Sequence, residues 1–212
     1  MLDLGHNALT AVPCSLGELG RLEVLYLSDN RLSMLPAELE RLGRLTYLGL
    51  TDNELAELPD WLGMLTGLVE LRLYNNRLAG LPESVGSLGR LRELHVMNNR
   101  LTGLPDSIGG LSSLRDLDLM NNELAALPAG IGGLGRLARL NLRNNRLAVL
   151  PETVGGLVSL THLDLRANRL TALPPALAGL PLLEKLDLRW NQFSGLPGWL
   201  DELRARGCVV LT

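Results

Sequence analysis

Asparagine and proline recur along this chain at a spacing of 23 residues, and no other feature limits the possible folds as strongly. Nine asparagines keep the spacing, at positions 7, 30, 53, 76, 99, 122, 145, 168 and 191, and nine prolines keep it from Pro13 to Pro197. Alignment on these residues gives the pattern LxxLxLxxNxLxxLPxxLxxLxx, with an aliphatic residue in nearly every leucine position. Self-similarity of this kind is typical of a repeat architecture.

Each repeat is too short to bury an apolar face alone, so it must stack on its neighbours. In the repeat that starts at residue 68, Leu68, Leu71 and Leu73 come from a segment whose leucines alternate as in a strand, and we expect all three to point inward. The returning limb completes the same layer with Leu78, Leu81, Val85 and Leu88.

The pattern resembles the leucine-rich repeat family, in the 23-residue form with an LP pair that occurs in bacterial repeat proteins and in eukaryotic Ras-pathway scaffolds. The resemblance runs from Met1 to about Leu203. It implies an α/β fold, a curved right-handed solenoid with a parallel β-sheet on the concave face and short helical or irregular convex segments. We expect one domain over residues 1–212, with a partial first repeat at 1–21, full repeats at 22–44, 45–67, 68–90, 91–113, 114–136, 137–159, 160–182 and 183–205, and a closing strand at 206–212.

The resemblance assigns the repeated asparagine to structure. In this family it lies inside the turn after the strand and bonds to backbone groups that would otherwise be buried without partners. The predicted ladder consists of Asn7, Asn30, Asn53, Asn76, Asn99, Asn122, Asn145, Asn168 and Asn191. The asparagine just before, such as Asn75, suits either a row of hydrogen bonds in the groove or the geometry of the turn.

The N-terminal end of the array lacks a cap. The leucine that should precede Leu2 and Leu4 is missing, although repeat arrays normally need a polar cap at each end. An upstream segment or a partner, including a second copy of the chain, would have to cover this edge. We expect the apolar edge to consist of Leu2, Leu4, Leu9, Leu16 and Leu19.

The C-terminal end closes the array better. Residues Trp199 to Arg206 predict a short helix with acidic residues towards solvent. In the strand that follows, we expect Val209 and Leu211 to point inward and Cys208 to point outward.

Composition argues against several classes of function. The net charge is −3, and the 20 basic and 23 acidic residues are scattered, which leaves no basic footprint for nucleic acid. No run reaches the roughly 18 apolar residues of a membrane span, and the N-terminus lacks a signal-peptide pattern. Two cysteines, Cys14 and Cys208, form no disulfide framework. We therefore expect a cytoplasmic protein that contacts neither nucleic acid nor membrane.

Several motifs in the sequence suggest catalysis, but their residues recur as ordinary parts of the repeat. GIGGLG at 130–135 fits G-x-G-x-x-G, but a dinucleotide site also needs a βαβ context. The same positions read SVGSLG at 84–89 and SIGGLS at 107–112, which places these glycines in the convex limb. Three aspartates on different strands, Asp118, Asp164 and Asp187, stand beside basic residues that would neutralise them. The three histidines are too far apart to share a metal ion. We expect no enzymatic activity, no cofactor and no metal.

The candidate binding surface is the face of the sheet that points into the groove. Counting from the first leucine of the pattern, repeat positions 2, 3, 5, 7 and 8 lie on it and hold every tyrosine and histidine of the chain. Position 7 reads Gly5, Ser28, Thr51, Tyr74, Met97, Met120, Arg143, Arg166 and Arg189. Aromatic residues, methionine and arginine are enriched at protein interfaces. We predict that a protein partner binds Tyr26, Tyr47, Arg72, Tyr74, His95, Met97, Met120, Arg143, Arg166, Arg189 and Trp190.

Two alternatives remain open at this point. Asn141, Asp164 and Asp187 each precede an arginine of position 7 by two residues. The charges can therefore satisfy one another on a solvated face that binds no partner. The chain can also be the recognition arm of a larger enzyme or secreted effector, because leucine-rich repeats occur joined to ubiquitin-ligase and kinase domains.

Overall fold

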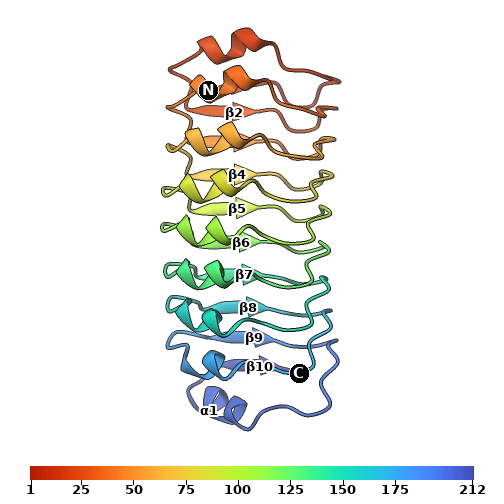
Figure 1. The fold of residues 1–212 in the computed structure, drawn as a ribbon, viewed down its shortest axis with the longest axis vertical. Helices are drawn as coiled ribbons and strands as arrows, with labels where there is room; N and C mark the ends of the chain where they lie inside the picture. The colour runs from red at the N-terminus through yellow and green to blue at the C-terminus, as the bar shows by residue number, and fades with distance from the viewer.

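Ten short parallel strands form one sheet in sequence order in the computed structural model, which describes residues 1–212 (Figure 1). Adjacent strands from β1 to β9 pair 23 residues apart, as Leu71 does with Leu94. The strands are β1 (Leu2–Asp3), β2 (Val24–Tyr26), β3 (Tyr47–Gly49), β4 (Glu70–Arg72), β5 (Glu93–His95), β6 (Asp116–Asp118), β7 (Arg139–Asn141), β8 (His162–Asp164), β9 (Lys185–Asp187) and β10 (Val209–Leu211). The predicted solenoid with a parallel sheet is confirmed.

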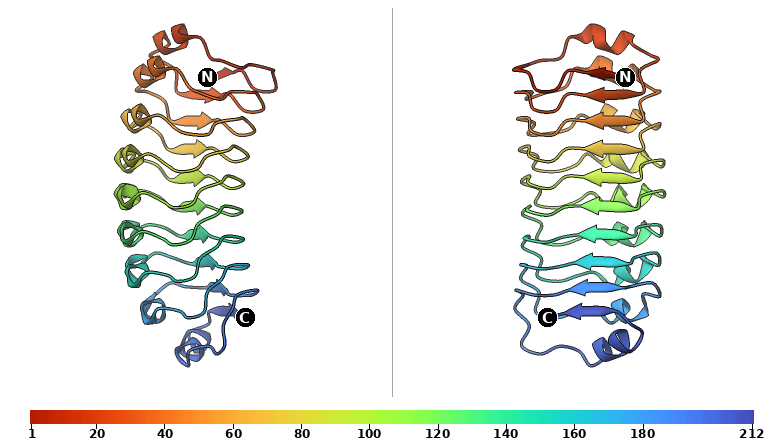
Figure 2. Two further views of the ribbon diagram at one scale, coloured as in Figure 1. Left: turned by 45° about the vertical axis from the view of Figure 1, so that its right-hand side comes forward. Right: turned by 180° about the vertical axis from the view of Figure 1, so that it is seen from behind.

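Short helices run along the side opposite the sheet (Figure 2). Eight are five-residue 3₁₀ helices, each preceded by the repeated proline in an extended conformation, as at Pro82 with φ −69° and ψ 153°. Proline suits this place because its φ is fixed near that value. The helices are η1 (Cys14–Glu18), η2 (Ala37–Arg41), η3 (Asp60–Met64), η4 (Glu83–Ser87), η5 (Asp106–Gly110), η6 (Ala129–Gly133), η7 (Glu152–Gly156), η8 (Pro175–Gly179) and the final α1 (Trp199–Ala205).

The core lies between the sheet and the helices as one continuous cluster of 56 buried residues, so no repeat has a core of its own. All seven leucines and valines expected in the layer of residues 68–88 are buried. Trp61 and Trp199 pack against this core from the convex side. No helix combines the length and the apolar character that crossing a membrane requires.

Three of the four glycines of GIGGLG allow convex turns to stack closely. A Cβ atom on Gly130 would lie 1.9 Å from the carbonyl oxygen of Asp106, and one on Gly132 would lie 2.5 Å from that of Thr153. A Cβ atom on Gly133 would lie 2.8 Å from the carbonyl oxygen of Gly109, whereas one on Gly135 would meet open space. Close packing therefore accounts for three of the four glycines without a nucleotide.

The repeated asparagine joins each repeat to the one before it. The Nδ2 of Asn76 donates to the carbonyl oxygens of Leu50, at 2.8 Å, and Leu73, at 3.0 Å, while its Oδ1 accepts from the Leu55 N–H at 3.0 Å. The same contacts recur from Asn30 to Asn191. Asn7, at the exposed end, donates only within its own turn, to Leu4 and Gly5.

Position 8 of every repeat lies in the left-handed region, with φ between 53° and 60°. Asparagine and aspartate tolerate this conformation best among non-glycine residues. The Asn98 Nδ2 also donates to the Asn75 Oδ1 at 2.6 Å, and similar bonds link Asn75 to Asp52, Asn121 to Asn98, and Asn144 to Asn121. Asn75 therefore has both expected roles, since it supplies the turn geometry and belongs to a row of hydrogen bonds in the groove. The row ends where position 8 becomes Ala167 and then Trp190.

The predicted side-chain orientation of the last strand is wrong. Cys208 is buried, Val209 is exposed, and Val210 pairs with Leu186, an offset of 24 residues rather than 23. The extra residue belongs to the connection through α1 and Gly207, which adopts a φ of +92°. A shift of one residue moves every side chain of a strand to its other face.

The N-terminal edge is less open than predicted. Strand β1 pairs only with β2, Leu19 is exposed, and Leu2, Leu4 and Leu9 are half-buried. Leu16, however, is buried within η1, so its assignment to the edge is wrong.

Candidate binding surface on the concave face

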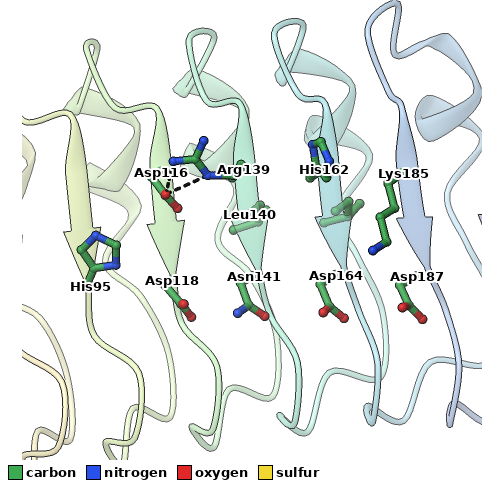
Figure 3. A pocket seen from close by; sticks show the side chains of 11 residues that line it. His95, Asp116, Asp118, Arg139, Leu140, Asn141, His162, Asp164, Lys185 and Asp187 are labelled. Atoms are coloured by element: carbon green, nitrogen blue, oxygen red, sulfur yellow. Dashed lines mark hydrogen bonds and ion pairs between the residues drawn. The ribbon is translucent and has the colours of Figure 1, made fainter. Parts of the chain in front are cut away.

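A hollow of about 280 Å³ crosses strands β5 to β9 on the face of the sheet that points away from the helices, the concave face. Figure 3 shows two rows of side chains along it, one at position 3 and one at position 5. Of the residues predicted to bind a partner, only His95 lines this hollow. Its lining consists of His95, Asp116, Asp118, Arg139, Leu140, Asn141, His162, Leu163, Asp164, Lys185 and Asp187.

A stacked group occupies the N-terminal part of the concave face. The rings of Tyr26 and Tyr47 lie 4.7 Å apart, and the guanidinium of Arg72 lies 5.8 Å from the centre of the Tyr47 ring. Tyr47 covers Gly49, where a Cβ atom would lie 3.0 Å from the ring. Arg72 also donates to the carboxylate of Glu70. The structure therefore brings three predicted residues together, away from the hollow.

The three residues predicted as an apolar anchor, Tyr74, Met97 and Met120, are each half-buried. They follow β4, β5 and β6, at position 7 of successive repeats. The column is therefore partly accessible to a partner and partly packed against its own strands.

Two of the three arginines in position 7 are already paired. The Arg166 Nε donates to the Asp164 Oδ1 at 2.9 Å, and the Arg189 Nη2 donates to the Asp187 Oδ2 at 2.6 Å. Burial alone would raise the pKa of Asp187, but hydrogen bonds from Arg189 and the nearby Arg166 charge outweigh it, so this pKa lies below its ordinary value. For these two repeats the charges satisfy one another, as the first alternative proposed.

The two preceding repeats lack this pairing of an aspartate at position 5 with an arginine at position 7. Arg143 has Asn141 in place of an aspartate, and it forms no ion pair. Asp118 has Met120 in place of an arginine, and its carboxylate accepts the Met120 N–H at 3.0 Å. Burial raises the pKa of Asp118, opposed by that bond and by a hydrogen bond from Asn141. The predicted neutralisation by neighbouring basic residues does not extend to this aspartate.

Trp190 stands apart from the rest of position 8. The residue is 65% exposed, its backbone φ is 60°, and the Arg189 guanidinium lies 5.6 Å from the centre of its ring. Together with Phe193 and Leu196 it lines a second hollow of about 410 Å³ next to the C-terminal Thr212. An exposed tryptophan in a strained backbone has no role in packing that accounts for it.

One set of side chains has donor atoms close enough for a metal ion. A carboxylate oxygen of Glu70, one of Glu93 and a ring nitrogen of His95 all lie within 4.8 Å of one another. Arg72 donates to Glu70, and the His95 Nε2 lies 3.3 Å from Glu93. Because Arg72 bonds to Glu70 and His95 contacts Glu93, the set forms a cluster of side chains that bond to one another.

The sequence-based prediction of the partner-binding residues missed the whole position 3 row of the hollow. Asp116, Arg139, His162 and Lys185 were not singled out, although Arg139 donates to Asp116 at 2.8 Å. A signal was present in the sequence, because position 3 changes from Glu70, Glu93 and Asp116 to Arg139, His162 and Lys185.

Comparison with protein families matches the chain over nearly its whole length. A model described as a leucine-rich repeat region matches residues 1–98, 37–126 and 82–163, and a leucine rich repeat model matches residues 135–193. Comparison with curated protein sequences finds no match.

Several solved structures share both the fold and the sequence pattern. The leucine-rich repeat protein LIC12759 of Leptospira interrogans is 36% identical over 100% of this chain, with a TM-score of 0.92, and this chain spans 53% of it. The plant peptide hormone receptor RGFR1, solved in complex with RGF2, is 35% identical over 100% of this chain, with a TM-score of 0.87, and this chain spans 35% of it.

A third similar structure is the leucine-rich repeat domain of the type III effector XopL. It is 30% identical over 89% of this chain, with a TM-score of 0.71, and this chain covers 75% of it. The repeat pattern, the ten-stranded parallel sheet and these matches agree. The chain belongs to the leucine-rich repeat family.

Proposed function

We propose that this chain is a non-enzymatic module that binds a partner protein along its concave face, through a segment in extended conformation. The observation that carries the proposal is the hollow across β5 to β9, which lies next to the half-buried column of Tyr74, Met97 and Met120. A hollow that crosses several strands, beside an apolar column, suits a polypeptide better than a compact small molecule.

The likeness to other leucine-rich repeat proteins supports the proposal, since that fold is a protein-interaction module and one similar receptor was solved in complex with RGF2. As part of the proposal we treat residues 1–212 as one domain and place it in the cytoplasm, which suits its two free cysteines.

Each part of the concave face has a distinct role in this proposal. Tyr74, Met97 and Met120 anchor apolar side chains of the partner, and Arg143 offers a charge that no internal group satisfies. The stacked Tyr26, Tyr47 and Arg72 extend the surface towards β2, and Trp190 extends it towards the C-terminus. Arg166 and Arg189 contribute mainly by holding Asp164 and Asp187 in place.

Photo-crosslinking from single positions tests this proposal. A diazirine amino acid replaces Met97 on the concave face in one variant and the exposed Met64 at the end of η3 in the control variant. Each variant is irradiated in a lysate of the native host. We expect a covalent adduct from position 97 and none from position 64. An adduct from position 64 alone, or from neither position, would contradict the proposal.

The second candidate is a recognition arm within a larger enzyme. It is favoured by the likeness to XopL, since that match is to the leucine-rich repeat domain of a type III effector. Sequencing the gene on both sides of this reading frame decides it. A catalytic domain in frame supports the arm, and stop codons on both sides count against it.

Self-association through the N-terminal edge is a separate proposal. Met1 and Leu19 are exposed there, next to the half-buried Leu2 and Leu4. Light scattering over a range of concentrations should then show a dimer that Leu19→Ser weakens. A monomer at every concentration would rule the edge out as an association site.

A further inference from the structure

The concave face divides into two parts of opposite charge. The residues at positions 2, 3, 5, 7 and 8 of the repeats of β1 to β6 include eight acidic and three basic side chains, Asp3, Glu23, Asp29, Asp52, Glu70, Glu93, Asp116 and Asp118 against Arg72, Arg92 and Arg115. The same positions in the repeats of β7 to β9 include five basic and three acidic side chains, Arg139, Arg143, Arg166, Lys185 and Arg189 against Asp164, Glu184 and Asp187.

The charge becomes more positive between β6 and β7 in two separate columns, from negative to positive at position 3 and from neutral to positive at position 7. Position 3 changes from Asp116 to Arg139, and position 7 changes from Met120 to Arg143. Neither change is needed for the core, because both positions lie on the face opposite to the buried leucines.

Two unpaired charges flank this boundary. Asp118 on β6 has no basic side chain bonded to it, and Arg143 after β7 has no acidic one, whereas Arg166 and Arg189 are both paired. The ammonium of Lys185 on β9 also lacks an ion pair, and it reaches over the hollow in Figure 3. At positions 3, 5 and 7 of the β5 to β9 repeats, the charges without an ion pair are therefore negative on β6 and positive in the repeats of β7 and β9. At position 2, Arg92, Arg115 and Glu184 also lack an ion pair.

We infer that the partner segment carries its own charges in two blocks, with basic residues over β4 to β6 and acidic residues over β7 to β9, and that the blocks meet at Asp118 and Arg143. The inference rests on the proposed function of this face. Strands lie about 4.8 Å apart and an extended chain rises about 3.3 Å per residue, so a segment of roughly eight residues spans β4 to β9. Opposed charge blocks fix the register of such a segment, because any shift brings like charges together.

Two synthetic peptides of equal composition test the inference. One fluorescent peptide of about twelve residues, long enough to span β4 to β9, carries its lysines in one half and its glutamates in the other. The comparison peptide alternates the lysines and glutamates. We expect the wild-type protein to bind the block peptide about tenfold tighter at low salt, and we expect this preference to shrink as salt is added.

Matched variants locate the effect. Asp118→Asn and Arg143→Gln together remove the two unpaired charges at the boundary between β6 and β7 without breaking a salt bridge, and we expect the preference for the block peptide to fall to about twofold or less. Asp60→Asn with Arg136→Gln makes the same chemical changes outside the concave face and should leave the preference intact.

The outcomes separate this inference from the function on which it rests. Equal affinity for the two peptides, or a block peptide that does not bind, overturns the charge inference, while crosslinking from position 97 still decides the concave function. A block preference that survives Asp118→Asn with Arg143→Gln overturns the inference as well. A salt-sensitive dimer in light scattering would assign the complementary charges to a second copy of the chain, and this too would overturn it.

Discussion

The guanidinium of Arg166 on the turn after β8 lies 3.3 Å from the carboxylate of Asp187 on β9, so one ion pair ties two adjacent repeats together. Arg189 binds the same carboxylate, whose side chain is only 3% exposed. Arg166 therefore stabilises the stacking of its own repeats. Replacing it would disturb the structure as well as any binding. Arg143, which has no such partner, is the better position at which to test binding.

Asp187 should contribute to stability in a way that depends on pH. Because its pKa is lowered in the folded chain, the unfolded chain binds more protons at acidic pH. This contribution is fully present above the ordinary carboxyl pKa and is lost as pH falls through the lowered pKa of the folded state. Asp187→Asn should flatten that part of the acid limb in thermal unfolding measured against pH. An unchanged acid limb would contradict this role.

Asp118 should show the opposite dependence. Burial raises its pKa, so the folded chain binds more protons than the unfolded chain just above the ordinary carboxyl pKa. Stability from this residue is present at low pH and declines as pH rises through the interval up to the raised pKa. We expect Asp118→Asn to stabilise the protein at neutral pH, measured by urea unfolding. A loss of stability at neutral pH would show that the charged carboxylate is well satisfied.

The asparagine ladder gives a prediction with an internal control. Asn76→Ala removes bonds to Leu50, Leu55 and Leu73 and should cost about 1–3 kcal/mol in the free energy of unfolding, because buried backbone groups lose their partners. Asn7→Ala, in the exposed first turn, should cost clearly less. Urea denaturation of both variants checks this, and equal costs would argue against the ladder.

Trp190 should lower the stability of the fold and raise the affinity for the partner. Trp190→Asn relieves a left-handed strain and should stabilise the fold by about 1 kcal/mol, while weakening the affinity for the partner. Ala167→Asn, at the same position of the preceding repeat, should also stabilise the fold but leave the affinity unchanged. Thermal unfolding and partner titration of both variants test this contrast. If Trp190→Asn binds as tightly as the wild type, the tryptophan is outside the interface.

Periodicity made the fold predictable from the sequence. The 23-residue spacing of Asn76 and its equivalents determines the strand register and the inward leucines, because side chains in a strand alternate strictly. The rule failed at Cys208, where the connection through α1 adds one residue to the spacing. A spacing derived from eight intervals contains no information about that change.

The candidate site was less predictable than the fold. Its column of position 7 could be read from the sequence, but the pairing of Arg166 with two aspartates depends on side-chain rotamers and on the distance between strands. The isolation of Asp118 and Arg143 follows from the same geometry. Only the structure separates charges that hold the repeats together from charges that remain for a partner.

The most direct test of partner binding on the concave face compares the affinity of the crosslinked partner for two matched triple variants, each first shown by circular dichroism to be folded. The concave variant carries Met97→Ala, Met120→Ala and Arg143→Gln, and the control carries Met34→Ala, Met64→Ala and Arg136→Gln outside the strands. We expect the concave variant to lose about tenfold or more in affinity and the control to stay within about twofold of the wild type. A loss confined to the control variant, with the concave variant unchanged, would contradict this expectation.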